Sequence, residues 1–187
     1  MRDAVYHFIS SWKVKSTKEE VYDVLGDAPG LARWWPSVYL DVKILSPGDA
    51  LGLGKIVELF TKGWLPYTLR WSFVVTAIDK PNGFTIVPSG DFSGGGIWTF
   101  EEDKQDPEYC NITYDWKIRA EKPLLRKLTF LVRPIFSANH RWAMKKGEES
   151  LKLELLRREA RRTGEKKYVP DPPGPTFPHN LTNNKIL

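Results

Sequence analysis

Large apolar residues alternate with small or polar ones along much of the chain, which predicts strands with one buried and one exposed face. In the first such run one face carries the side chains Tyr6, Phe8, Ser10, Trp12 and Val14. From 38 to 119 the chain holds further β-rich runs of about eight to eleven residues, divided by glycine-rich turns and one acidic loop. This punctuation predicts six further strands in an antiparallel meander.

Two of the later runs indicate which side chains face a core. One face holds Leu69, Trp71, Phe73, Val75 and Ala77 in the first of these runs, and Cys110, Ile112, Tyr114, Trp116 and Ile118 in the second. The polar residues between them fall on the opposite face, because successive side chains of a strand alternate. We therefore expect Arg70 and Asp115 to lie outside, in an exposed pair or a cross-strand network rather than in a catalytic site.

Two short helices are expected between the first strand and the meander. Ser16 and Glu19 have the spacing of a capping box, which predicts that the first helix begins there. The second covers about 31–35, and Pro36 ends it because the residue before a proline is pushed away from helical geometry.

A long helix is expected near the end of the chain. After Pro123 the pattern becomes helical, and Pro134 suits the first turn of a helix that continues to about Arg162. Helical spacing places one group of residues on a single side of it, namely His140, Met144, Gly147, Leu151 and Leu155. We expect this side to face the sheet.

Length and composition indicate one domain at 1–167 and a Pro-rich extended tail at 168–187. The start of the chain has no signal-peptide pattern, and no run is long enough to span a membrane, so a cytoplasmic location is expected.

The single cysteine, Cys110, excludes an internal disulfide, and three scattered histidines exclude most Cys/His zinc sites. No metal and no cofactor are expected.

The net charge of +5 is concentrated in one segment, where ten Lys or Arg residues accompany five Glu between 141 and 167. Interspersed opposite charges favour a solvated helix face, and transient contact with an anionic membrane surface is the alternative. Nucleic-acid binding is disfavoured because the aromatic residues do not interleave with Lys and Arg on a strand platform. Nothing in the sequence specifies an oligomeric state.

The expected order of elements is that of a helix-grip fold, an α+β architecture. A curved seven-stranded antiparallel sheet wraps around a long C-terminal helix, and two short helices follow the first strand. Six segments resemble the polyketide cyclase/dehydrase and lipid-transport family of the START-like, or SRPBCC, superfamily: WWP at 34–36, GWLPYTLRW at 63–71, GDFSGGGIW at 90–98, YDW at 114–116, KPLLR at 122–126 and NHRWAM at 139–144. The resemblance covers about residues 5–160. It implies a deep apolar cavity between sheet and helix that takes lipids, sterols, polyketides or other hydrophobic molecules.

Aromatic side chains on the inward faces suit such a cavity, although completing the core is an equal alternative. The expected ligand-binding residues are Trp71, Phe73, Trp98, Tyr114, Trp116, His140 and Met144. A neutral His140 can donate to a ligand carbonyl or act as a base on an acidic carbon. Helix packing and hydrogen bonds to loop backbone explain the Asn139–His140 pair as well, and the structural role is favoured.

Glu58 is the second catalytic candidate. It shares a strand face with Ile56 and Phe60, and if that face points inward, its unpaired carboxyl will have a raised pKa. A gate at one end of the cavity is expected from three aromatic residues in loop segments, Trp35, Trp64 and Tyr67. A packed loop is the alternative for these residues.

Three classes of function fit the sequence. A non-catalytic binder or carrier of a hydrophobic small molecule is favoured, because no coherent catalytic set is present. A polyketide aromatase/cyclase-type enzyme, with His140 or Glu58 assisting enolisation and dehydration, is the first alternative. The second is a protein-interaction or regulatory module that docks through the basic helix and the tail.

Overall fold

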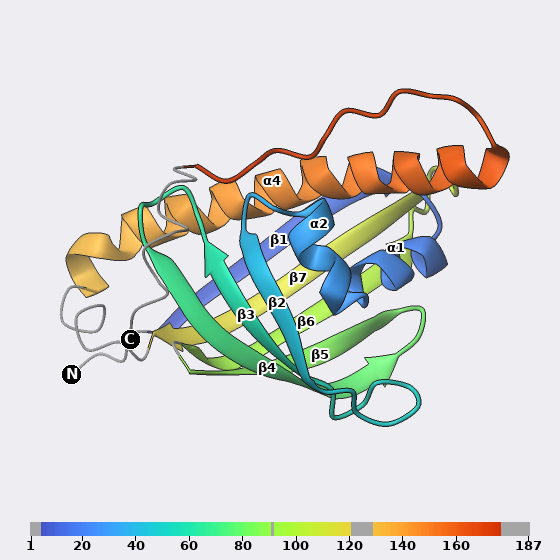
Figure 1. Ribbon diagram of the computed structural model, residues 1–187. Coiled ribbons are helices and arrows are strands. Elements are labelled where there is room, and N and C mark those ends of the chain that lie inside the picture. The colour runs from blue at the N-terminus through green and yellow to red at the C-terminus, as the bar shows by residue number, and fades with distance from the viewer. Residues whose placement is uncertain (1–4, 91, 121–128, 177–187) are drawn as a thin grey trace.

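Seven strands form one strongly curved sheet, and a long helix lies across its concave face (Figure 1). The computed structural model describes residues 5–90, 92–120 and 129–176, so the KPLLR segment lies outside the described residues. The elements in chain order are β1 (Val5–Lys15), α1 (Lys18–Leu25), η1 (Ala28–Gly30), α2 (Leu31–Trp34), β2 (Tyr39–Ser46), β3 (Ile56–Lys62), β4 (Thr68–Asp79), β5 (Gly83–Gly90), β6 (Phe92–Glu102), β7 (Tyr109–Ala120) and α4 (Thr129–Thr163).

The strand order in the sheet is β1-β7-β6-β5-β4-β3-β2, and every neighbouring pair is antiparallel. Strands that follow one another from β2 to β7 are sheet neighbours, as short connections favour. β1 closes the far edge by pairing with β7 along its whole length, from Val5 opposite Arg119 to Lys15 opposite Tyr109. The predicted helix-grip fold is confirmed.

The predicted faces of the strands are confirmed except at Ala77, whose predicted inward position is wrong. A β-bulge follows Val75, so Ala77 is exposed and the half-buried Ile78 takes the inward side. Cys110, Ile112, Tyr114, Trp116 and Ile118 of β7 are all buried on the concave side. On the convex side Arg70 donates to Glu58 at 3.3 Å, and His7 lies 2.9 Å from a carboxylate oxygen of Asp115. These polar residues therefore form the cross-strand pairs that the alternation predicted.

The predicted beginnings of two helices are wrong. α1 begins one residue later, because Thr17 is its N-cap and its hydroxyl accepts the backbone N–H of Glu20 at 3.2 Å. Ser16 instead donates to the carboxylate of Glu20 at 2.7 Å. α4 begins at Thr129, so Pro134 lies inside the helix rather than in its first turn. A proline there lacks the N–H for one helical hydrogen bond, which a helix tolerates when its packing is otherwise good.

The C-terminal half of α4 is held to the rest of the fold by an apolar stripe and one ion pair. Met144, Gly147, Leu151 and Leu155 are buried, which confirms the predicted inward side. On the same part of the helix, the buried carboxylate of Glu154 accepts two hydrogen bonds from Arg33 of α2, at 2.7 and 2.8 Å. α2 is thereby fixed against α4 at one end of the cavity.

Residues 165–176, which we call the strap, run back along the side of α4 that faces away from the sheet (Figure 1). Arg157 of α4 donates to the carbonyl of Pro170, and the Thr176 hydroxyl lies 3.3 Å from the carbonyls of both Gly63 and Trp64. The strap contains neither helix nor strand. Across the described ranges, no helix is long and apolar enough to cross a membrane.

Candidate functional site: an aromatic chamber between sheet and helix

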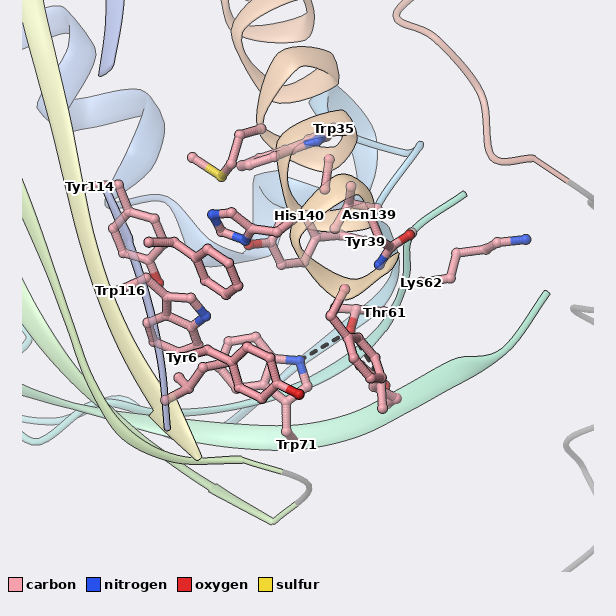
Figure 2. A pocket seen from close by; sticks show the side chains of 18 of the residues that line it. Tyr6, Trp35, Tyr39, Thr61, Lys62, Trp71, Tyr114, Trp116, Asn139 and His140 are labelled. Atoms are coloured by element: carbon pink, nitrogen blue, oxygen red, sulfur yellow. Dashed lines mark hydrogen bonds between the residues drawn. The ribbon is translucent and has the colours of Figure 1, made fainter. Parts of the chain in front are cut away.

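A cavity of about 150 Å³ lies between the concave face of the sheet and α4, and we call it the front chamber. Six of the seven predicted ligand-binding residues line it: Trp71, Trp98, Tyr114, Trp116, His140 and Met144. Strands β4, β6 and β7 supply the four aromatic rings of this set, and α4 supplies His140 and Met144. Figure 2 shows Trp71, Tyr114, Trp116 and His140 around the cavity. The structure therefore brings these residues together, while ligand binding by them stays a prediction.

Stacked rings form one wall of the front chamber. Tyr114 lies between Trp98 and Trp116, with ring centroids 4.0 and 5.4 Å away. Gly96 of the neighbouring strand makes this stack possible, because a Cβ there would lie 2.6 Å from the Trp116 ring and 2.8 Å from the Tyr114 hydroxyl. The wall offers flat apolar surface of the kind that planar ligands stack against.

His140 points from α4 toward Tyr114 and Trp116 (Figure 2). Its ring stacks on Phe8 with centroids 4.2 Å apart, and its Nε2 lies 3.4 Å from the Ser10 hydroxyl. Burial, with a smaller contribution from Arg141, lowers the pKa of His140 to about 4. The imidazole is therefore neutral at neutral pH and offers a hydrogen-bond donor and an acceptor.

The other polar groups of the chamber are also uncharged, with the exception of Lys62. Thr61 accepts from the indole N–H of Trp71 at 3.0 Å. Burial raises the pKa of the Tyr39 and Tyr114 hydroxyls far above their ordinary range, and it raises the pKa of Tyr67 to about 12. These hydroxyls therefore stay protonated and able to donate. None of the described residues that line the chamber is Asp or Glu.

The three predicted gate residues occupy different places. Trp35 is only 2 % exposed and forms a wall of the chamber, packed over Gly147, where a Cβ would lie 2.3 Å from the indole. Tyr67 lines the chamber, whereas Trp64 is 37 % exposed and does not line it. Asn139 holds the loop of Trp64 by accepting its backbone N–H at 2.9 Å. Gating by these residues stays a prediction.

Two candidate residues lie away from the front chamber. Glu58 points to the convex face, because its neighbours Val57 and Leu59 are buried on the concave side. The inward alternative for Glu58 is therefore wrong. Phe73 is buried but lies deeper in the interior, beyond Trp71 along β4.

Several residues that line the chamber were not predicted as site residues, namely Tyr6, Phe8, Tyr39, Thr61, Lys62 and Phe136. The inward alternation of β1 indicated Tyr6 and Phe8. Lys62 carried no such signal, because a lysine at a strand end is normally exposed. It is 3 % exposed, and its ammonium points away from the cavity and donates to the carbonyl of Thr176 in the strap (Figure 2). Burial lowers its pKa.

Comparison with known proteins defines the class of fold. No model of a protein family and no curated protein sequence matches the chain. Among solved structures, a protein of Thermus thermophilus is 18% identical, with a TM-score of 0.63 over 78% of this chain and 97% of that one. The Zhui aromatase/cyclase from Streptomyces sp. R1128 is 19% identical, with a TM-score of 0.61 over 83% of this chain and 96% of that one.

A norcoclaurine synthase from Thalictrum flavum is 12% identical, with a TM-score of 0.58 over 85% of this chain and 99% of that one. Identities at this level establish the shape of the chain and not its activity. The chain has the helix-grip fold that the resemblance implied.

Proposed function

We propose that the protein binds a hydrophobic small molecule containing a planar ring in the front chamber, and that it holds or carries this ligand without turning it over. The observation that carries the proposal is a wall of stacked rings facing hydrogen-bond donors that are uncharged at neutral pH. Rings bury large apolar areas, and a few fixed polar groups orient a ligand. A ligand with one carbonyl or hydroxyl on an aromatic ring matches this chamber.

A binder is favoured over an enzyme because acid/base chemistry normally uses two positioned groups. The described lining holds no carboxylate, and the low pKa of His140 makes it a weak base. A cyclase-type enzyme is the second candidate, supported by the unprotonated imidazole inside the chamber and by a fold shared with an aromatase/cyclase. Turnover of a poly-β-ketone by the wild type, lost in His140→Gln, would favour this candidate.

The test pairs two adjacent glycines of β6, neither of which has a positive φ. A Cβ at Gly96 meets the rings of the chamber wall, whereas a Cβ at Gly95 meets only a backbone oxygen at 4.0 Å. We expect Gly96→Ala to weaken binding of phenol by about tenfold or more in calorimetric titration, because the added Cβ displaces the rings of the chamber wall. A tenfold loss of affinity corresponds to about 1.4 kcal/mol of binding free energy. Gly95→Ala should bind like the wild type.

Native mass spectrometry of the purified protein, with extraction of any bound small molecule, tests the same proposal without a chosen probe. Equal phenol affinity in both glycine variants would place the ligand outside the front chamber. Failure of the wild type both to bind phenol and to carry any extractable molecule would overturn the proposed function. Thermal unfolding of both variants confirms that each one is folded.

Contact of α4 with an anionic membrane surface stays a secondary proposal. Several of its cations are already paired within the helix: Lys146 with Glu149, Lys152 with Glu148, and Arg158 with Glu154. These pairs favour a solvated face over a free basic patch. Sedimentation with vesicles that contain phosphatidylserine, compared with neutral vesicles, distinguishes a solvated face from a membrane-binding face. A membrane-binding face sediments with the anionic vesicles only.

We expect the strap to slow exchange of ligand through the loop at Gly63 and Trp64. Thr176→Val removes the hydroxyl that bonds these two carbonyls, with little change in shape. The dissociation rate of bound phenol should rise about fivefold, the equivalent of a net hydrogen bond of about 1 kcal/mol. Thr163→Val removes a hydroxyl bonded only within α4 and is the matched control. Equal rates in stopped-flow fluorescence would show that the strap has no part in exchange.

A further inference from the structure

A second cavity of about 270 Å³, which we call the rear chamber, lies between the end of α1, the β2–β3 loop and strands β4 and β5. Its lining is largely apolar and includes Tyr22, Leu25, Leu31, Phe73, Val75 and Phe84. Its rim contains Leu51, which is 79 % exposed, together with the charged side chains of Asp23, Asp27 and Lys55. The rear chamber therefore opens to the surface away from the loop at Gly63.

A narrow space of about 40 Å³ lies between the two chambers. It shares Trp35, Tyr39, Trp71, Trp98 and Tyr114 with the front chamber. It shares Leu25, Leu31, Phe73 and Phe84 with the rear chamber. Because neighbouring spaces share these lining residues, the three spaces lie in one row through the interior, and Phe73 lines the narrow space between the two chambers.

The volumes restrict what can occupy this row. A cavity of about 150 Å³ holds a single small ring, whereas sites for larger small molecules measure about 300–1,000 Å³. The front chamber alone therefore accepts a ring and little more. The narrow space is too small for a second ring, but its aliphatic and aromatic walls suit a chain of methylene groups.

We propose that the ligand is an elongated amphiphile, whose aromatic ring lies in the front chamber and whose unbranched alkyl chain passes Phe73 into the rear chamber. This inference rests on the proposed function, because it assumes that the front chamber binds the ring. The polar groups of the front chamber orient the ring substituent. The apolar walls of the rear chamber contribute affinity in proportion to chain length.

The test uses para-alkylphenols with chains from ethyl to octyl, titrated calorimetrically against the full chain. In the wild type, affinity should rise about fourfold for each added methylene that is buried. Val75→Phe fills the rear chamber, so the rise should stop at shorter chains while para-ethylphenol binds with unchanged affinity. Val74→Phe adds the same bulk at the next position of β4, on the convex face, and should give the wild-type series.

Unchanged affinity for para-ethylphenol shows that a variant is folded around its front chamber. If Val75→Phe fails this check, Ile78→Phe adds bulk at the half-buried rim of the rear chamber instead. A wild-type series that is flat beyond ethyl, or one that Val75→Phe and Ile78→Phe leave unchanged, overturns the inference and leaves the proposed function standing. If para-ethylphenol and phenol both fail to bind the wild type, the proposed function itself fails.

Discussion

Replacing Arg33 by alanine is expected to lower the free energy of unfolding by about 3 kcal/mol, because it leaves a buried carboxylate without its two closest hydrogen-bond donors. The side chain of Glu154 is 1% exposed and accepts two hydrogen bonds from Arg33 and one from Arg158 at 3.1 Å. Burial alone would raise the pKa of Glu154, but these hydrogen bonds outweigh it and hold the pKa below its ordinary value. In Arg33→Ala only Arg158 remains.

The measurement is urea and thermal denaturation, in which Arg33→Ala should lower Tm by roughly 6–12 °C. Replacing both partners, as Arg33→Met with Glu154→Leu, should recover most of this loss, because an apolar pair leaves no unpaired buried charge. Arg158→Ala is the matched control and should cost less, since both hydrogen bonds from Arg33 survive. A loss below about 1 kcal/mol in Arg33→Ala would show that water reaches the carboxylate and that the pair behaves as a surface ion pair.

This ion pair bears on the proposed site as well as on stability. Arg33 belongs to α2, and Trp35, which follows α2, packs over Gly147 and forms a wall of the front chamber. Loosening α2 from α4 therefore moves a chamber wall. We expect the affinity for phenol to fall together with stability in Arg33→Ala, whereas Arg158→Ala changes neither strongly.

The strand faces could be predicted because alternation is a local signal. The alternation of inward and outward side chains along a strand placed four aromatic residues on the concave side without any knowledge of which strands pair: Trp71, Trp98, Tyr114 and Trp116. The helical period likewise placed His140 and Met144 on the inward side of α4. Six of the residues that line the front chamber were therefore foreseeable, although the rest of its lining and its volume were not.

Features that depend on contacts between distant segments could not be predicted. Lys62 is buried because residue 176 of the strap lies over it. No local sequence pattern predicts that a segment so distant in the chain folds back onto this strand. Glu154 appeared to be one member of a mixed-charge helix face until α2 supplied Arg33. Glu58 was ambiguous because three alternate positions near a strand end do not fix which face is inward.

The depth of a side chain in the space between sheet and helix could not be predicted from local patterns either. Phe73 and Trp71 share one face of β4, and alternation treats them alike. The curvature of the sheet separates these two side chains. Trp71 lines the front chamber, and Phe73 lines the narrow space and the rear chamber. The position of a side chain along the curved strand thus decides which part of the proposed ligand it contacts. Trp71 lies beside the aromatic ring, and Phe73 lies beside the alkyl chain.

Acidification is expected to destabilise the protein through His140. Its pKa is lowered from 6.5 to about 4 in the folded state, so the unfolded chain takes up a proton first as the pH falls. The stability from the neutral imidazole is present above pH 6.5 and is lost progressively down to about pH 4, where the loss reaches at most about 3 kcal/mol. Below that pH the folded state is protonated too, and no further loss arises from this group.

His140→Gln removes this titration and keeps a polar side chain at the position. Between neutral pH and about pH 4, urea denaturation should show the free energy of unfolding falling by up to about 3 kcal/mol more in the wild type than in His140→Gln. Carboxylates titrate in the same range, but they do so in both proteins and cancel in the difference. His7→Gln, which replaces an exposed histidine on the convex face, is the control for the loss of a histidine outside the chamber. Parallel curves for the wild type and His140→Gln would mean that His140 is hydrated, and a hydrated front chamber would not hold the apolar ring proposed for it.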